Sequence, residues 1–253
     1  MQQRFRARRA RVHVVGTAST IAFLLAGISP APAAAQVRPV PPDSSVRADS
    51  GQQIERVLVK AIRAGDLAPI SQKTITRDVI TQRAVGQDPP MLLQGASPSL
   101  TAHTETGTLW GYSYLRLRGV DQTRINITLD GVPLNDMEDQ VLYFADLPDL
   151  MASVQSVQVQ RGVGTSTAGT ASYAGSVNFE TVPLAVRGAG GDASVQLGSF
   201  GARRVSGAFH SGLTGSGFAM LGRVSALQTN GYRDHSGVLG RSAFVSGGWF
   251  GDR

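Results

Sequence analysis

The chain has 253 residues, a length that allows one or two domains. It contains no cysteine, which excludes disulfide scaffolds, cysteine-ligated zinc and thiol nucleophiles. The formal net charge is +6, but residues 1–35 hold five arginines and no acidic side chain, so the rest of the chain carries only +1. The basic charge therefore belongs to the N-terminus and gives no support to a nucleic-acid-binding face on the folded part.

The first 35 residues have the three parts of a secretory signal peptide. Arginines within positions 4–11 form a positive region, residues 14–28 are apolar, and the alanines at 33–35 favour cleavage before Gln36. A retained membrane anchor is the alternative, but the apolar stretch is short for a membrane span and Pro30 follows it. The next segment, 36–53, is polar and contains three prolines, so we predict a disordered linker there.

Residues 54–183 are predicted to form a small α+β domain. Thr76 can begin a short helix through Val85, and Asp88-Pro89 begins a second helix that ends at Gly95. Alternating apolar residues then predict strands at 114–118, 124–129, 157–161 and 177–181. Asp130-Gly131 is a strong turn signal after the second of these strands, and residues 148–152 suggest a helical turn.

The last 68 residues have a different pattern and contain 16 of the 30 glycines. Apolar side chains such as Val205 and Val224 alternate with polar ones such as Arg204 and Arg223, over about ten residues at a time. This alternation predicts strands of a membrane barrel, although a β-sandwich also alternates. No stretch of about 18 apolar residues follows the signal region, which excludes a helical membrane protein. About four strands cannot close a barrel in lipid, so we expect the chain to be the front part of a longer protein.

Five motifs, in order, resemble those of the TonB-dependent outer-membrane receptors. Residues 55–61 (ERVLVKA) resemble the energy-coupling box near the mature N-terminus, although Lys60 stands where the family often has a small polar residue. The other four resemble strands and turns of the family's plug domain: LRLRG at 115–119, LDGVPLND at 129–136, VQVQRG at 157–162 and AGSVN at 174–178. In the third of these, Val159-Gln160 replaces the commoner acidic pattern. The resemblance covers residues 54–250.

The resemblance implies an α+β plug domain at 54–183, followed at 184–253 by the start of an antiparallel transmembrane β-barrel (incomplete, about four strands). It implies an outer-membrane receptor for active uptake of a scarce nutrient, of the siderophore, cobalamin or glycan class, with the plug gating the barrel lumen. The implied partners are a TonB-type inner-membrane energy transducer, the extracellular substrate and outer-membrane lipid. No enzyme activity, metal or cofactor is implied. The alternative is a free-standing periplasmic plug-like interaction module that does not transport, in which residues 186–253 would be vestigial or disordered.

The resemblance also assigns residues to three groups. The segment that binds the energy transducer comprises Glu55, Arg56, Val57, Leu58, Val59, Lys60 and Ala61. The loop before the first plug motif offers substrate contacts through His103, Trp110, Tyr112 and Tyr114, although these rings could instead pack the plug against the barrel wall. The structural residues of the plug motifs are Arg116, Arg118, Gly119, Asp130, Gly131, Arg161, Gly162 and Asn178. We expect the arginines among them to pair with carboxylates of the plug or the barrel wall.

Patterns typical of other functions are incomplete. The glycines at 162–169 lack the third glycine of a dinucleotide loop, and Thr170 stands where a P-loop needs lysine. No G-x-S-x-G motif occurs, and the four histidines have no metal-ligand spacing. The acidic residues at 136–139 lack the order of an EF-hand loop, so a solvated loop is the simpler interpretation.

Overall fold

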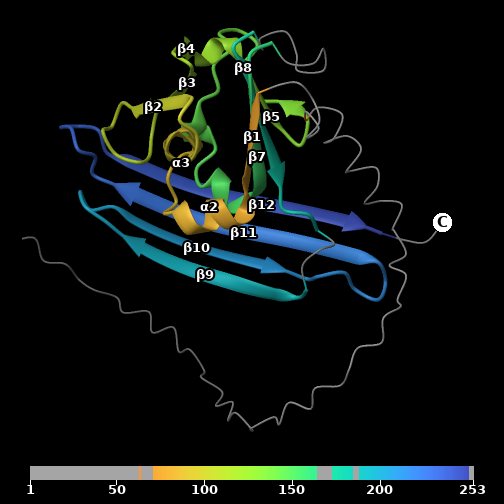
Figure 1. Cartoon of the computed structure of the whole chain (residues 1–253). Helices are drawn as coiled ribbons and strands as arrows, with labels where there is room; N and C mark the ends of the chain where they lie inside the picture. Colours follow the sequence, from red (N-terminus) through yellow and green to blue (C-terminus); the bar gives the residue numbers. More distant parts are fainter. Residues whose placement is uncertain (1–62, 64–70, 164–172, 185–187, 251–253) are drawn as a thin grey trace, which may run out of the picture. The chain divides into compact units, whose positions relative to one another are not determined.

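The computed structural model describes residues 63, 71–163, 173–184 and 188–250 (Figure 1). The expected signal peptide and linker and the candidate coupling segment 55–61 lie outside these residues. The elements, in chain order, are β1 (Gln72–Thr76), α2 (Arg77–Arg83), α3 (Pro89–Ala96), β2 (Leu100–Thr104), β3 (Ser113–Leu117), β4 (Val120–Asp121), η1 (Gln122–Arg124), β5 (Ile125–Leu129), β6 (Val132–Pro133), η2 (Phe144–Asp146), η3 (Leu150–Ser153), β7 (Val154–Arg161), β8 (Gly175–Thr181), β9 (Gly190–Leu197), β10 (Arg203–His210), β11 (Phe218–Thr229) and β12 (Val238–Trp249).

A five-stranded mixed sheet is the centre of the α+β domain. Its order is β1-β7-β8-β5-β6; β5 and β8 run parallel and the other neighbours are antiparallel. Alternate residues of β7 and β8 are apolar, and Val157, Val159, Val177 and Phe179 are at most 1% exposed. These side chains join residues of α2, α3 and β3 in one core. Burial of this apolar face is the main source of the domain's stability.

The opposite face of β7 and β8 is polar, yet it is also buried. Gln158, Gln160 and Asn178 are at most 4% exposed. Thr128 Oγ1 donates to Asn178 Oδ1 at 2.7 Å, and Gln160 Nε2 donates to Gln158 Oε1 at 2.8 Å. Buried polar groups are stable only when they are hydrogen-bonded, so this face depends on a side-chain network.

The turn predicted at Asp130-Gly131 is present and joins β5 to β6. Both residues have positive φ, +49° and +86°, as a type I′ turn requires. The Asp130 carboxylate also accepts hydrogen bonds from the main-chain N–H and the hydroxyl of Thr181, at 2.8 and 2.7 Å. The aspartate therefore ties the turn to the end of β8.

The predicted helices and strands are found, with some ends moved. The first helix ends at Arg83 rather than Val85, and the second ends at Ala96, one residue after Gly95. The sequence pattern gave no sign of β1 or β2, since each of these strands buries a single apolar side chain. Main-chain hydrogen bonds to β7 and to β3 hold these two strands in place. Such bonds do not depend on the side chains, so the sequence shows no alternation of apolar and polar residues there.

Residues 190–249 form an antiparallel sheet with the order β12-β11-β10-β9, so the strands expected in the last 68 residues are confirmed (Figure 1). One face carries exposed apolar side chains such as Val205, Phe209 and Val245, and the other carries Arg204 and Arg223, both buried. The fold class is therefore the one expected from the sequence, an α+β domain followed by a run of antiparallel strands.

Candidate functional site

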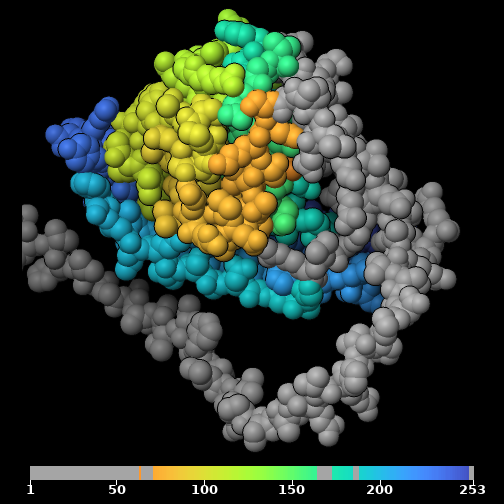
Figure 2. Space-filling model, in the orientation of Figure 1, coloured from red at the N-terminus to blue at the C-terminus, as the bar shows by residue number. Residues whose placement is uncertain are grey.

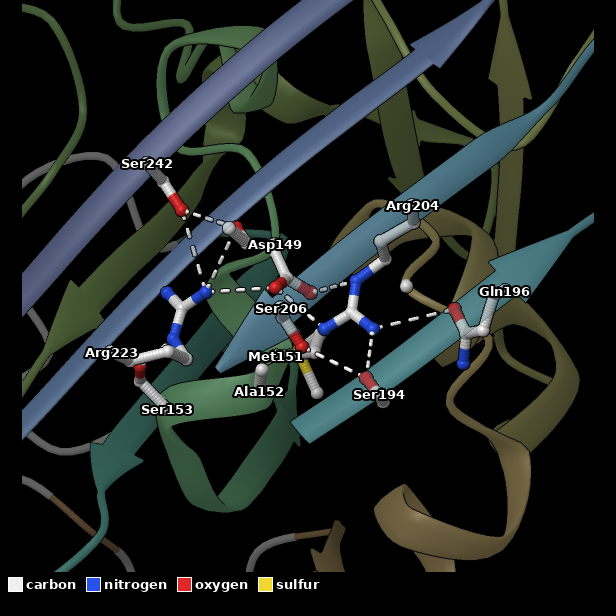
Figure 3. Close-up of polar contacts among 12 residues, drawn as sticks. Asp149, Met151, Ala152, Ser153, Ser194, Gln196, Arg204, Ser206, Arg223 and Ser242 are labelled. Carbon is white, nitrogen blue, oxygen red and sulfur yellow. Dashed lines mark hydrogen bonds and ion pairs between the residues drawn. The ribbon is translucent and has the colours of Figure 1, made fainter. Parts of the chain in front are cut away.

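A buried ion cluster joins the α+β domain to the four-stranded sheet (Figure 3). Asp149 precedes η3 with a φ of +61°, and its side chain is 2% exposed. Its carboxylate accepts two hydrogen bonds from Arg204 of β10, from Nε at 3.0 Å and from Nη2 at 2.6 Å. Arg223 of β11 donates from Nη1 to the same carboxylate at 2.8 Å. One carboxylate thus holds two buried guanidinium groups.

Hydroxyl groups around the two arginines accept further hydrogen bonds (Figure 3). Arg204 Nη1 donates to Ser194 Oγ of β9 at 2.9 Å. Arg223 Nε donates to Ser153 Oγ at 2.8 Å, and its Nη1 lies 3.4 Å from Ser242 Oγ of β12. The cluster therefore involves all four strands. Removing one partner from such a buried pair leaves an uncompensated charge, which is strongly destabilising.

Two glycines let the α+β domain approach the strands closely. A Cβ at Gly86, whose φ is +79°, would lie 2.3 Å from Cδ of Arg204. A Cβ at Gly240 of β12 would lie 3.2 Å from that of Pro148. Figure 2 shows residues of the domain in direct contact with β9, in agreement with the position of Gly86 beside Gln196. A cavity of about 230 Å³ lies next to the ion cluster.

The four candidate substrate-contact residues fall into two groups. Trp110 is 5% exposed, and its Nε1 donates to the carbonyl of Gly86 at 2.7 Å, so it packs inside the domain. The other three are closer to the surface. Tyr114 stacks on His103 with ring centroids 5.3 Å apart, and Tyr112 is 52% exposed. Trp110 and Tyr112 also line a cavity of about 650 Å³, together with residues 233–240 of the β11–β12 region.

Sequence reasoning missed a further ring, that of Tyr143. It meets Tyr112 edge to face with centroids 6.1 Å apart. Its hydroxyl donates to Asp139 Oδ2 at 2.6 Å, and this bond raises the pKa of Tyr143 to about 12. The pairing could not be foreseen because 30 residues separate the two tyrosines. Within the described ranges, no three histidine or acidic side chains are grouped as metal ligands.

Asp88 joins the helix α3 to the loop that carries these rings. Its carboxylate accepts hydrogen bonds from the Gly111 N–H and the Ser113 hydroxyl, both at 3.0 Å. Burial raises the pKa of Asp88 to about 7, although these two bonds favour the ionised form. The carboxyl group therefore changes its charge near neutral pH.

The residues of the plug motifs lie at turns and within the central sheet. Arg118 and Gly119 both have positive φ at the turn after β3, and Gly162, the residue after β7, also has positive φ. Asn178 belongs to the polar network of β8. Ion pairs between two described residues join Asp149 to two arginines and Arg63 to Glu180, and none of these pairs includes Arg116, Arg118 or Arg161.

Comparison with known proteins agrees with this architecture. Residues 66–176 match the family model of the TonB-dependent Receptor Plug Domain. Three solved structures share the fold: the ferric citrate transporter FecA (19% identity, TM-score 0.58), the alcaligin outer-membrane receptor FauA of Bordetella pertussis (16%, 0.52) and FpvA of P. aeruginosa bound to pyoverdines (17%, 0.50). They match 72, 65 and 64% of this chain, which spans 29, 27 and 21% of their own lengths. No curated protein matches the chain in a sequence comparison.

The fold and the match together define the class of the protein. It is an α+β plug joined to antiparallel strands like those that begin the barrel of outer-membrane receptors. Residues 66–176 belong to the family of TonB-dependent receptor plug domains. Among the described residues, no helix is long and apolar enough to cross a membrane.

Proposed function

We propose that the protein is an outer-membrane receptor that takes up a scarce nutrient with energy from a TonB-type transducer. The Asp149 cluster is the observation that carries this proposal. It fastens the plug to the polar face of strands whose other face is apolar and exposed. A plug fixed to the lumen side of a lipid-facing wall must be displaced before a substrate can pass.

The location of the protein follows from the same features. Residues 1–35 direct export, with cleavage before Gln36, and the exposed apolar face of β9–β12 contacts outer-membrane lipid. Residues 54–183 lie within the barrel and on its periplasmic side as the plug. No covalent step is part of this function.

Energy enters through residues 55–61. A short β-type run after a polar linker is suited to pairing with a sheet edge of the inner-membrane transducer, because main-chain hydrogen bonds supply most of the affinity in this mode of recognition. Pull on this segment then rearranges the plug.

A ferric chelate is the first substrate class to test, with cobalamin and glycans as the alternatives. Proteins of this fold include a ferric citrate transporter and a receptor bound to pyoverdines. The exposed rings of His103 and Tyr112 and the half-buried rings of Tyr114 and Tyr143 offer flat faces for substrate beside the cavity of about 650 Å³. The buried Trp110 supports this surface from inside.

The alternative of a free-standing periplasmic module is less well supported. It requires residues 186–253 to be vestigial or disordered. Strands β11 and β12 are instead 12 residues long and paired throughout, and Arg223 of β11 is bound to the plug.

Proline substitutions test the proposal. We expect the double variant Val57→Pro, Val59→Pro to lose energy-dependent uptake of a radioactive ferric chelate but to keep its binding to cells, because proline removes the N–H groups that pair with the transducer. Ser44→Pro in the linker is the matched control and should take up the chelate normally. Unchanged uptake in the double variant would show that 55–61 is not the coupling segment. No binding of any ferric chelate, with binding of cobalamin or a glycan, would change the substrate class.

A further inference from the structure

The side chain of Arg63 lies on the polar face of β7 and β8 and makes four hydrogen bonds there. Nη1 donates to Ser156 Oγ at 2.8 Å and to Glu180 Oε2 at 3.0 Å. Nη2 donates to the main-chain carbonyls of Ser156 at 3.2 Å and of Asn178 at 2.9 Å. The Arg63 side chain is 13% exposed. A single residue is thus bound to both strands of the central pair.

An irregularity in the sheet lies beside the place where Arg63 binds. The register of β7 against β8 shifts between Val154 and Ser156. A bulge of this kind leaves backbone groups without a partner in the ladder. The planar guanidinium has five N–H donors in a fixed arrangement and can make all four of these bonds, whereas an ammonium has only three donors. Ser156 Oγ also donates to Glu180 Oε2 at 2.6 Å and thereby orients the carboxylate.

The position of Arg63 in the sequence determines when its contacts bear a force applied to the N-terminal side. Arg63 comes two positions after Ala61, the last residue of the candidate coupling segment. It comes nine positions before Gln72, where β1 begins. Tension applied to residues 55–61 therefore reaches the Arg63 contacts before it reaches β1.

After the Arg63 contacts, β1 is the next element on which this tension would act. Among the described strands it lies at the sheet edge and pairs with β7 alone, and Ile75 is its one buried side chain. While Arg63 is bound, the force enters the centre of the sheet through β7 and β8. Once Arg63 is released, the same force peels β1 from the sheet edge.

We propose that Arg63 is a positioning residue for transport, which fixes the N-terminal segment to the β7–β8 pair and must be released before β1 is peeled from the plug. The proposal rests on the proposed function, because it takes residues 55–61 as the point where the transducer pulls. Its mechanical part can be tested without transport.

The direct test is to pull the intact receptor in a lipid bilayer through a handle attached at residue 55. We expect a first rupture that lengthens the chain by at most about 30 Å, the reach of the nine residues up to Gln72, before β1 detaches. Arg63→Ala should abolish this first rupture, and Arg63→Lys should keep it at a lower force through the remaining contact with Glu180.

Arg77 is the matched control. Its guanidinium also binds main-chain carbonyls, those of Met151 and Val154, but it lies after β1 in the chain. Arg77→Ala should therefore leave the force of the first rupture unchanged and lower only the forces of later ruptures. A first rupture that persists in Arg63→Ala, or that disappears in Arg77→Ala, would overturn the proposal.

Uptake in cells separates this proposal from the function on which it rests. We expect Arg63→Ala to retain binding of substrate and of the transducer's periplasmic domain but to change the uptake rate. Arg63→Lys should bring the uptake rate part of the way back to that of the wild type. The double variant Glu180→Gln, Arg63→Ala should have the same uptake rate as Arg63→Ala alone. Normal uptake in Arg63→Ala, alongside loss of uptake in the Val57→Pro, Val59→Pro variant, would refute the role of Arg63 and leave the receptor function intact.

Discussion

Gly175 occupies a position where a side chain has no room. It begins β8 with a φ of +150°, and a Cβ there would lie 2.2 Å from the carbonyl oxygen of Gln160 and 2.4 Å from Cδ2 of Leu117. The first of these atoms belongs to the backbone of β7 and cannot move without breaking the ladder. The glycine of the AGSVN motif is therefore required by the packing of the central sheet.

Gly175→Ala should lower the free energy of unfolding of the plug by roughly 3 kcal/mol or more, because an unfavourable φ is added to overpacking. Gly119→Ala is the control: its φ is +82°, but no atom lies within 4 Å of the added Cβ. This variant should lose only about 1–2 kcal/mol. Urea unfolding measures both losses when it is followed by the tryptophan fluorescence of variants in which the exposed Trp249 is replaced by Phe, so that Trp110 is the reporter. Equal losses would mean that the contact with Gln160 is not as tight as described.

The carboxyl group of Asp88 makes the stability of the plug depend on pH. Its pKa is about 7 in the folded chain and 3.8 as the ordinary value. Between these values the unfolded chain loses the proton while the folded chain retains it. The stabilisation is therefore complete below pH 4 and is lost as the pH rises towards 7.

The difference in unfolding free energy between the wild type and Asp88→Asn should thus shrink as the pH is raised from 4 to 7. The full change is about 3–4 kcal/mol at most, since one pKa unit corresponds to about 1.4 kcal/mol. Urea unfolding at several pH values measures it. A difference that does not vary with pH would show that Asp88 is ionised throughout.

The segment before η3 holds the plug against the strands through Asp149. Asp149→Asn should weaken this attachment by roughly 3–5 kcal/mol, because Arg204 and Arg223 are left buried without a counter-charge. Asp146→Asn is the matched control, since Asp146 is exposed and lies in the neighbouring turn η2. The urea concentration at which Trp110 becomes exposed should fall only in the first variant. A similar urea midpoint in both variants would show that the Asp149 cluster does not hold the plug against the strands.

The elements differ in how far the sequence could predict them. Strands β3, β5, β7 and β8 alternate clearly because one face of each meets the apolar core, and the sequence places them within a few residues. The edge strand β1 buries one side chain and was not predicted. Strand alternation also placed Arg204 and Arg223 on the polar face, and the structure agrees.

Less of the candidate site than of the strands could be predicted from the sequence. Asp149 and its two arginines are more than 50 positions apart, and no local pattern links them. The sequence predicts substrate contact for Trp110 because aromatic side chains in a loop suit ligand binding, but its indole N–H donates to the carbonyl of Gly86. Contacts of this kind depend on how the elements pack, which periodicity does not describe.

At the scale of the whole molecule, two of the polar attachments among the described residues act on different parts of the plug. The Asp149 cluster ties it to β9–β12, and Arg63 ties the N-terminal segment to its central sheet. Under the proposed function, the first attachment would resist removal of the plug from the barrel wall, and the second would receive the pull of the transducer. Because the Arg63 contacts lie within the plug, they can open while the wall contacts remain closed.

Outer-membrane location is the central claim, and fractionation of native cells tests it most directly. Membranes would be probed with an antibody against the plug, and heated and unheated samples would be compared on a denaturing gel. We predict that the protein is in the outer-membrane fraction and that heating shifts its mobility, because a folded barrel resists detergent until heated. A protein found only in the periplasmic fraction, with the same mobility before and after heating, would contradict the receptor function.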